Sequence, residues 1–360
     1  MKAVVSGGGT GGHIYPALSI AQRLRADGVE VLYMGGKGSM EAKLAAENGF
    51  AFFGVDCAGL HRRSLSIIKD LLTNARGLGQ ARRCLKEFQP NVVVGTGGYA
   101  EAPVLKSAAN LGIPTVLHEQ NAFPGLANRT MARQAKAVCL TFQAAAPYFP
   151  HQDRLHLTGL PIREQILTAK REQARAYFDI PDDGKATLLI TGGSQGAATL
   201  NKAAVEAIPD FLQQGLRVIH ICGEKEYFKW KQLLPEHPCL LLRPYIDHME
   251  YALALADVAV ARAGASFIAE ALAIGLPTIL VPYPYAANDH QRFNALALQE
   301  QGAAIMVEDK CFDGARLRQE ATALLLDEAH RQEMSAHCRE MALSDAADRI
   351  VKIIYGILKK

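Results

Sequence analysis

Two glycine-rich segments, residues 7–13 (GGGTGGH) and 192–197 (GGSQGA), have the composition of loops that hold phosphate groups. Each follows a short apolar run, so each is predicted to lead from a buried strand into a helix. Glycine lets the backbone adopt positive φ and approach a ligand closely, and a helix start offers unpaired N–H donors at the positive end of its dipole. We therefore expect two nucleotide-binding-type domains that face one cleft and handle a phosphorylated substrate.

His13 closes the first of these segments, where the predicted helix begins. An unperturbed imidazole has a pKa of about 6.5, so it can accept a proton at neutral pH. His13 is therefore a candidate general base. The alternative is a residue at the end of a helix that simply faces solvent.

Two further turns in the first half carry groups that suit a ligand. Residues 95–100 (GTGGYA) form a third glycine-rich turn, which is either a second anion site or a tight turn without a ligand. Residues 118–121 (HEQN) follow a predicted strand over residues 115–117, and ligands bind beyond the carboxyl ends of parallel strands. Such a polar group is hard to explain by packing, although a plain polar loop remains the alternative.

The densest group of candidate residues lies between residues 262 and 294. Glu270 is on a helix predicted after the turn at residues 263–265, where its carboxylate could accept both hydroxyls of a ribose while helix-start N–H groups hold a diphosphate. The alternative is a glutamate that only stabilises its helix. Gln291 and Asn294 have amides that both donate and accept, which suits sugar hydroxyls.

Composition narrows the functional classes. A length of 360 residues predicts two domains, and 49% apolar with 21% charged residues is typical of a soluble globular protein. The net charge of +3 excludes a strongly basic nucleic-acid binder. Seven scattered cysteines without a C-x-x-C pair indicate neither a zinc site nor a disulfide framework, and favour a reducing cytosol. We expect no signal peptide and no membrane span, so any membrane contact is peripheral.

Short apolar runs alternate with amphipathic helical segments along the whole chain, which is the pattern of an α/β protein. Residues 112–114 and 275–277 both place Gly, an apolar residue and Pro between a helix and a strand. We predict an N-terminal domain over residues 1–159 and a C-terminal domain over residues 160–344. A last amphipathic helix, at about residues 345–360, is expected to pack back on the first domain.

Six ordered motifs together resemble the MurG-type lipid-linked glycosyltransferases of peptidoglycan synthesis, glycosyltransferase family 28. They are residues 7–18 (GGGTGGHIYPAL), 95–103 (GTGGYAEAP), 118–129 (HEQNAFPGLANR), 158–163 (TGLPIR), 191–197 (TGGSQGA) and 262–295, which begins RAGASFIAEAL. The resemblance implies the GT-B fold, an α/β architecture of two Rossmann-like doubly wound domains facing an inter-domain cleft, with the donor mainly on the C-terminal domain.

The same resemblance implies an enzyme that inverts the anomeric carbon and moves GlcNAc from UDP-GlcNAc to the C4 hydroxyl of MurNAc. The acceptor is undecaprenyl-diphosphate-MurNAc-pentapeptide (lipid I), and the product is the β-1,4-linked lipid II. It implies no tightly bound cofactor and no essential divalent metal. The expected place is the cytoplasmic face of the cell membrane, as a peripheral protein with other cell-wall synthesis proteins as further partners.

By motif, the resemblance assigns His13 as the catalytic residue. The residues assigned to the donor are Thr10, Gly11, Gly12, Asn121, Arg163, Ser194, Ile246, Ala265, Ser266, Phe267, Ile268, Ala269, Glu270 and Gln291. The acceptor diphosphate is assigned to Gly97, Gly98 and Tyr99.

The chain departs from the family pattern at three positions. Leu160 stands where Asn is usual, and Phe267 stands where a Thr hydroxyl would reach phosphate. Glu101 stands where a small polar residue is usual, and a carboxylate beside an acceptor diphosphate is electrostatically unfavourable.

Residues 61–88 form a basic segment with seven Lys or Arg and two acidic residues. Leu65, Ile68, Leu72, Leu78 and Leu85 recur in it at roughly helical spacing, and such a segment suits an anionic membrane surface. The candidate membrane surface comprises Arg62, Arg63, Leu65, Ile68, Lys69, Arg82 and Arg83. The alternative is a core-facing helix whose basic face is solvated.

Two other functions fit the same fold. One is a UDP-GlcNAc 2-epimerase, which needs no lipid surface. The other is a non-catalytic UDP-sugar-binding scaffold of the cell-wall machinery.

Overall fold

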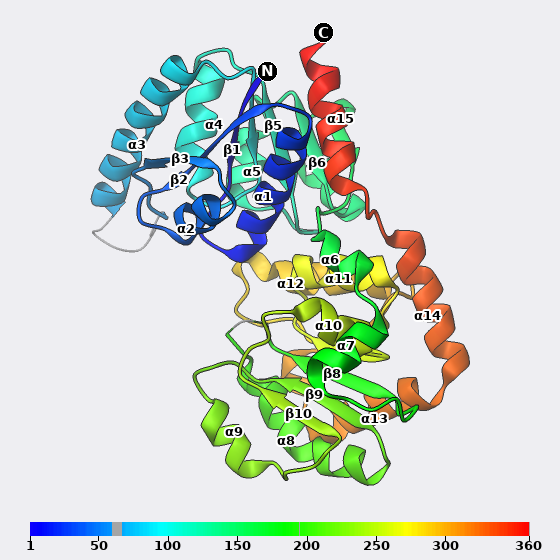
Figure 1. Ribbon diagram of the computed structural model, residues 1–360. Coiled ribbons are helices and arrows are strands. Elements are labelled where there is room, and N and C mark those ends of the chain that lie inside the picture. The colour runs from blue at the N-terminus through cyan, green and yellow to red at the C-terminus, as the bar shows by residue number, and fades with distance from the viewer. Residues whose placement is uncertain (60–66, 194, 360) are drawn as a thin grey trace. The chain divides into compact units, whose positions relative to one another are not determined.

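The computed structural model describes residues 1–59, 67–193 and 195–359, with the side chains of residues 67–69 excepted. The chain divides into two compact units (Figure 1). Unit 1 contains Met1–Ile162 and Leu343–Lys360, and unit 2 contains Arg163–Ala342. The division falls after Ile162, three residues beyond the boundary expected from the sequence.

Unit 1 is built on a parallel sheet. Its strands are β1 (Lys2–Ser6), β2 (Glu30–Gly36), β3 (Ala51–Val55), β4 (Val92–Gly95), β5 (Thr115–Glu119), β6 (Ala137–Leu140) and β7 (Leu155–Leu157). Over the described residues they form one seven-stranded sheet in the order β3-β2-β1-β4-β5-β6-β7, and every pairing is parallel. The central strands are apolar runs because helices cover both faces of such a sheet.

The strand order of unit 1 changes direction between β1 and β4, which pair with Ser6 opposite Gly95. At such a switch point the connections leave in opposite directions, and ligands bind beyond the carboxyl ends of the strands. The two glycine-rich turns of this unit, residues 7–10 and 96–100, therefore lie at its switch point.

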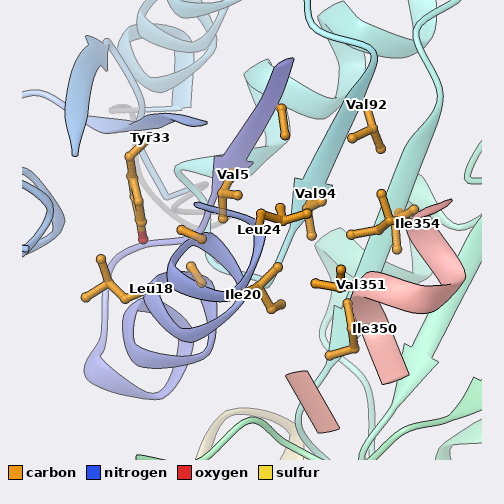
Figure 2. Packing of buried hydrophobic residues seen from close by; sticks show 14 of the residues in the cluster. Val5, Leu18, Ile20, Leu24, Tyr33, Val92, Val94, Ile350, Val351 and Ile354 are labelled. Atoms are coloured by element: carbon orange, nitrogen blue, oxygen red, sulfur yellow. The ribbon is translucent and has the colours of Figure 1, made fainter. Parts of the chain in front are cut away.

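The helices of unit 1 are α1 (Gly11–Ala26), α2 (Met40–Glu47), α3 (Ile67–Phe88), α4 (Glu101–Asn110), α5 (Leu126–Met131) and α15 (Ala346–Leu358), with short 3₁₀ turns η1 (Gln143–Tyr148) and η2 (Gln152–Arg154). Helix α15 joins the core although it follows all of unit 2 in the chain: Ile350, Val351 and Ile354 pack with Leu24 and Val94 (Figure 2). At the rim of this contact Tyr355 Oη donates to Asp27 Oδ2 at 3.0 Å.

Unit 2 repeats the architecture. Its strands are β8 (Thr187–Thr191), β9 (Arg217–Ile221), β10 (Leu240–Arg243), β11 (Val258–Ala261), β12 (Thr278–Leu280) and β13 (Ala304–Met306). Over the described residues they form one parallel sheet in the order β10-β9-β8-β11-β12-β13. Its switch point lies between β8 and β11, where Thr191 pairs with Ala261. The loops at residues 192–197 and 262–264 leave the sheet there.

The helices of unit 2 are α6 (Glu164–Thr168), α7 (Arg171–Phe178), α8 (Ala198–Gln213), α9 (Tyr227–Leu233), α10 (Met249–Leu255), α11 (Ala265–Ile274), α12 (His290–Gln299), α13 (Gly314–Leu326) and α14 (Glu328–Met341), with 3₁₀ turns η3 (Ala287–Asp289) and η4 (Asp309–Cys311). Helix α11 ends at Gly275, which adopts a left-handed conformation with φ of 68°. This glycine stops the helix before Pro277 as the sequence predicts.

Candidate functional site

The two glycine-rich turns of unit 1 are packed directly against each other. Gly98 has a φ of 89°, and a Cβ added to it would lie 2.1 Å from the carbonyl oxygen of Gly8. The N–H of Gly8 in turn donates to the carbonyl of Gly97 at 3.3 Å. Only glycine permits this close approach with positive φ, so the two turns form one rigid backbone surface at the switch point.

His13 lies on this surface, half-buried in the first turn of α1. Its Nδ1 is 3.2 Å from the carbonyl oxygen of Gly8 and 3.2 Å from Oγ1 of Thr10. Because a carbonyl oxygen can only accept, we assign the proton of the neutral ring to Nδ1. Nε2 then carries the lone pair, on the side of the ring that packs against Gly97. This is the tautomer that a general base requires.

The polar residues after β5 are mostly enclosed by the protein. His118, Glu119 and Gln120 are buried, and burial lowers the pKa of His118 to about 4 and raises the pKa of Glu119. The Glu119 carboxylate accepts from the backbone N–H of Asn121 at 2.9 Å and from the Asn128 side chain at 2.9 Å. These side chains organise the loop, so packing does explain three of the four polar residues, which the sequence reading found hard to explain in that way. Asn121 alone is half-buried.

Glu101 does not place a negative charge on the second glycine-rich turn. Its side chain is buried, and one carboxyl oxygen accepts from the N–H of Gly97 at 2.6 Å. Burial raises the pKa of Glu101 to about 8, so the group is mostly neutral at pH 7. The electrostatic objection raised by the sequence therefore disappears. Since the Gly97 N–H is occupied, an anion at this turn would meet Gly98 and the half-exposed Tyr99.

In unit 2 the loop after β8 is fixed by a second close backbone contact. Gly196 has a φ of 72°, and a Cβ there would lie 2.1 Å from the carbonyl oxygen of Cys222. Asn201, one turn into α8, donates to that same carbonyl at 2.8 Å. The glycine is thus required to close the loop on the end of β9. Ser194, which the sequence assigns to the donor, lies outside the described residues.

The start of α11 combines a helix N-terminus with an ion pair. The six assigned donor residues are the first six of this helix, Ala265, Ser266, Phe267, Ile268, Ala269 and Glu270. Nε and Nη2 of Arg163 donate to Oε1 of Glu270 at 3.2 and 2.9 Å, while Oε2 takes part in neither bond. Burial raises the pKa of Glu270, and the Arg163 guanidinium opposes this rise by favouring the charged carboxylate. In this structure Arg163 thus contacts Glu270 itself.

Phe267 and Leu160, the two apolar residues that depart from the family pattern, are both accommodated by packing. Phe267 packs with the core cluster of unit 2 that contains Ile166 and Ile246, and Leu160 is buried in unit 1. At this position a ring that makes apolar contacts therefore stands where the family has a hydroxyl. The backbone of Phe267 still lies at the start of the helix. Because Ile246 is buried as well, only its backbone is suited to contact a polar ligand.

Gln291 and Asn294 on α12 have different surroundings. Gln291 is partly exposed, and its Oε1 accepts from the N–H of Tyr283 at 2.9 Å, which leaves its amide N–H₂ as the polar group to offer. Asn294 is fully buried and donates to the carbonyl of Ala263 at 3.1 Å. The suggestion that Asn294 reads a sugar is wrong, because it ties α12 to the loop before α11. Arg262 similarly holds the carbonyls of Val281 and Pro282, a role that sequence reasoning missed.

The geometry of Gln291 gives a first prediction. Gln291→Ala should raise the Kd of UDP-GlcNAc roughly fivefold or more, since a hydrogen bond contributes about 1 kcal/mol, and should leave the Kd of UDP within twofold. Isothermal calorimetry with both ligands checks this, with the exposed Gln301→Ala as control. Equal losses for the two ligands would show that Gln291 does not contact the sugar.

Helix α3 contains the described part of the predicted membrane surface. Arg82 and Arg83 are exposed, but Leu85 is buried in the core of unit 1 and Leu78 is half-buried, so the predicted apolar stripe is not one surface. The exposed leucines among the described side chains of the helix are Leu72, a member of the predicted stripe, and Leu71, at 58% and 54% exposure. Arg62, Arg63 and Leu65 lie outside the described residues, as do the side chains of Ile68 and Lys69. Among the helices described, none has the length and apolarity needed to cross a membrane.

A pocket of about 600 Å³ elsewhere in unit 2 contains none of the predicted site residues. It lies among α6, α10, α11 and α14, and its lining includes Arg171 and Arg331. Arg171 pairs with Asp257 at 2.9 Å, and Arg331 donates to the carbonyl of Leu324 at 2.9 Å. These guanidinium groups serve the protein's own structure, so the donor residues are better placed at the switch point.

Comparison with known proteins shows the family to which the chain belongs. Residues 3–140 match the glycosyltransferase family 28 N-terminal domain, and residues 187–350 match the family 28 C-terminal domain. The chain is 40% identical, over all of both sequences, to the UDP-N-acetylglucosamine–N-acetylmuramyl-(pentapeptide) pyrophosphoryl-undecaprenol N-acetylglucosamine transferase of Desulforamulus reducens.

Two solved structures share the fold. The crystal structure of Acinetobacter baumannii MurG is 30% identical, with a TM-score of 0.79 and 99% of each chain covered. A UDP-GlcNAc 2-epimerase of Neisseria meningitidis has a TM-score of 0.72 over 99% of this chain and 100% of its own, but only 13% identity, so that likeness concerns the fold alone. The two parallel sheets are thus those of the GT-B fold. On the full-length identity and the two domain matches, the chain belongs to glycosyltransferase family 28.

Proposed function

We propose that this chain transfers GlcNAc from UDP-GlcNAc to the C4 hydroxyl of MurNAc in undecaprenyl-diphosphate-MurNAc-pentapeptide, with inversion at the anomeric carbon. The observation that carries the proposal is full-length identity of 40% to a transferase whose name describes these two substrates. In this proposal His13, whose Nδ1 faces the Gly8 carbonyl, is the base, and Glu270, which is paired with Arg163, contacts the ribose.

In the proposed mechanism, Nε2 of His13 takes the proton of the C4 hydroxyl as its oxygen bonds to the anomeric carbon. The bond from that carbon to the UDP oxygen breaks on the opposite face, and UDP leaves as the diphosphate. N–H groups at the start of α11 stabilise the charge that develops on the leaving group, and we expect no divalent metal to be required. Unit 2 supplies the α11 contacts to the donor, while unit 1 supplies the base, the other assigned donor residues Thr10, Gly11, Gly12 and Asn121, and the acceptor contacts.

One assay tests the proposal against its alternatives. UDP release from UDP-GlcNAc is measured with and without a short-chain lipid I analogue. The proposal requires release that depends on the analogue and yields the disaccharide product. Conversion of UDP-GlcNAc into its 2-epimer without an acceptor would instead identify an epimerase, and donor binding with no turnover would identify a scaffold.

We further propose that α3 brings unit 1 to an anionic membrane surface, as a peripheral contact that gives access to the lipid-linked acceptor. Arg76, Arg83 and Lys86 lie on the exposed side of the helix, at spacings of three to seven residues, and Leu72 lies one turn before Arg76. The opposite side, with Ala81 and Leu85, is buried in the core. Basic side chains beside exposed leucines match the chemistry of an anionic lipid surface.

Neutralising Arg76 and Arg83 tests this surface. Each basic residue near an anionic bilayer contributes about 1 kcal/mol, so Arg76→Gln with Arg83→Gln should weaken binding to anionic vesicles by roughly 30-fold at low salt. Vesicle sedimentation measures the change. Lys225→Gln with Lys231→Gln, two exposed lysines of unit 2, makes the same change in net charge and should have little effect. If vesicle binding is unchanged and insensitive to salt, α3 is only a core-facing helix whose basic face is solvated.

A further inference from the structure

We propose that Gln120 is a positioning residue for the base: its amide ties the backbone of Thr96 to His118 and so holds the Thr96–Gly97 segment against the ring of His13. This inference rests on the proposed role of His13. Gln120 lies one residue beyond β5 and is almost fully buried. It belongs to no donor or acceptor contact assigned so far.

The amide group of Gln120 connects Thr96 to His118. Its Nε2 donates to the carbonyl oxygen of Thr96 at 2.5 Å, and it lies 3.0 Å from Nδ1 and 3.1 Å from the carbonyl oxygen of His118. Because a carbonyl can only accept, the nitrogen of the amide must face Thr96, and the orientation of the side chain is fixed.

His118 is built to receive the second N–H. Its Nε2 is 2.8 Å from the carbonyl oxygen of Gly159, so Nε2 carries the proton and Nδ1 accepts from Gln120. The ring is buried and stays neutral, since burial lowers its pKa to about 4. Gly159 is itself fixed within unit 1: its φ is 79°, and a Cβ there would lie 2.5 Å from Cβ of Leu343. His118 therefore gives Gln120 a firm anchor.

Thr96, the residue held by the Gln120 amide, is hydrogen-bonded to His13. Its Oγ1 donates to the carbonyl of His13 at 2.8 Å, and its N–H donates to the carbonyl of Ser6 at 2.9 Å. The next residue, Gly97, packs so closely on the imidazole that a Cβ would lie 2.7 Å from Cδ2 and 3.0 Å from Nε2. A shift of the Thr96 carbonyl would therefore move the surface that sets the orientation of the base.

The other amide atom of Gln120 argues against simple packing. Its Oε1 is buried and has no hydrogen-bond partner among the described residues. A Cβ added to Gly97 would lie 3.3 Å from this oxygen. An unpaired buried acceptor costs free energy that an apolar side chain of similar size would avoid. The residue is thus better explained by what its N–H₂ group holds in place than by the filling of space.

Gln120→Met removes both N–H donors while it keeps most of the volume. We expect kcat to fall 10- to 100-fold, while KM for UDP-GlcNAc stays within threefold because the donor contacts assigned to α11 belong to unit 2. Gln22→Met makes the same change at an exposed glutamine and should leave kcat unaltered. Melting temperatures confirm that each variant is folded at the assay temperature. A normal kcat in Gln120→Met overturns the proposal.

The His13→Ala background separates positioning from general damage. If Gln120 acts through His13, Gln120→Met should lower kcat by less than threefold in that background, because coupled residues are not additive. A loss as large as in the wild-type background would overturn the proposal.

His118→Gln keeps an amide that can donate to Gly159 and accept from Gln120, so it should retain more kcat than His118→Leu. A normal kcat in His13→Ala itself would disprove the base, which is a distinct result.

Discussion

His13→Ala is expected to lower kcat by about 10²- to 10⁴-fold, the usual contribution of a general base, with little change in donor affinity. The physical reason is the tautomer: the Gly8 carbonyl favours the proton on Nδ1, so Nε2 is the ring nitrogen that would accept the proton of the acceptor hydroxyl. The ring contacts backbone of unit 1, whereas the assigned donor contacts of α11 belong to unit 2. Removal of the ring should therefore affect the chemical step and spare donor binding.

Single-turnover kinetics with saturating donor and acceptor measure the effect, and calorimetry measures UDP-GlcNAc binding. His330→Ala, at an exposed position of α14, is the matched control and should keep wild-type turnover. Near-normal turnover in His13→Ala would remove the imidazole from the mechanism. His13 would then be the solvent-facing helix residue that the sequence left as the alternative.

Glu270→Ala is expected to weaken both UDP and UDP-GlcNAc by about 10- to 100-fold, as a hydrogen bond to a charged group contributes about 1.5–3 kcal/mol. Arg163 occupies Oε1 of the carboxylate, so Oε2 is the oxygen that a ribose hydroxyl would use. Both ligands contain the ribose, so both should lose affinity equally. Calorimetry that finds unchanged UDP affinity would leave Glu270 as a residue that only stabilises its helix.

Arg163→Ala complements this test through pH. Burial raises the pKa of Glu270, and Arg163 lowers it, so removal of Arg163 should raise that pKa further. A carboxyl with a raised pKa is protonated as the pH falls, so UDP binding to Arg163→Ala should weaken toward acidic pH more steeply than in the wild type. Parallel pH profiles for the two proteins would show that Arg163 does not control the charge of Glu270.

Most of the sheet could be predicted because buried parallel strands are short apolar runs. Residues 187–190, for example, correspond to β8 (Thr187–Thr191). Strand β7 (Leu155–Leu157) was missed because its residues are half-exposed or exposed and form no apolar run. Helix α14 (Glu328–Met341) was missed because Met334 and Cys338 are its only buried residues in the structure described, too few for a clear periodicity.

The site was less predictable because its electrostatics depend on burial. From its position in the sequence, Glu101 looks like a surface carboxylate beside a phosphate-binding loop. Tertiary packing instead buries the side chain and raises its pKa to about 8. Gln120 and Asn294 are likewise polar residues that suit a ligand, and both are almost wholly enclosed. A sequence places such residues beside a strand end but does not show which way the side chain turns. The assigned ligand contacts themselves stay predictions.

The return of α15 to unit 1 has a consequence for biosynthesis. Nascent domains usually complete their folding in the order in which they leave the ribosome. Here Ile350, Val351 and Ile354 belong to the same core cluster as Val5, Leu24 and Val94 (Figure 2). Unit 1, although made first, must therefore wait with an uncovered apolar face until all of unit 2 has been synthesised. Unit 2, which is continuous in the chain, can close its core earlier, so the order of folding is the reverse of the order of translation.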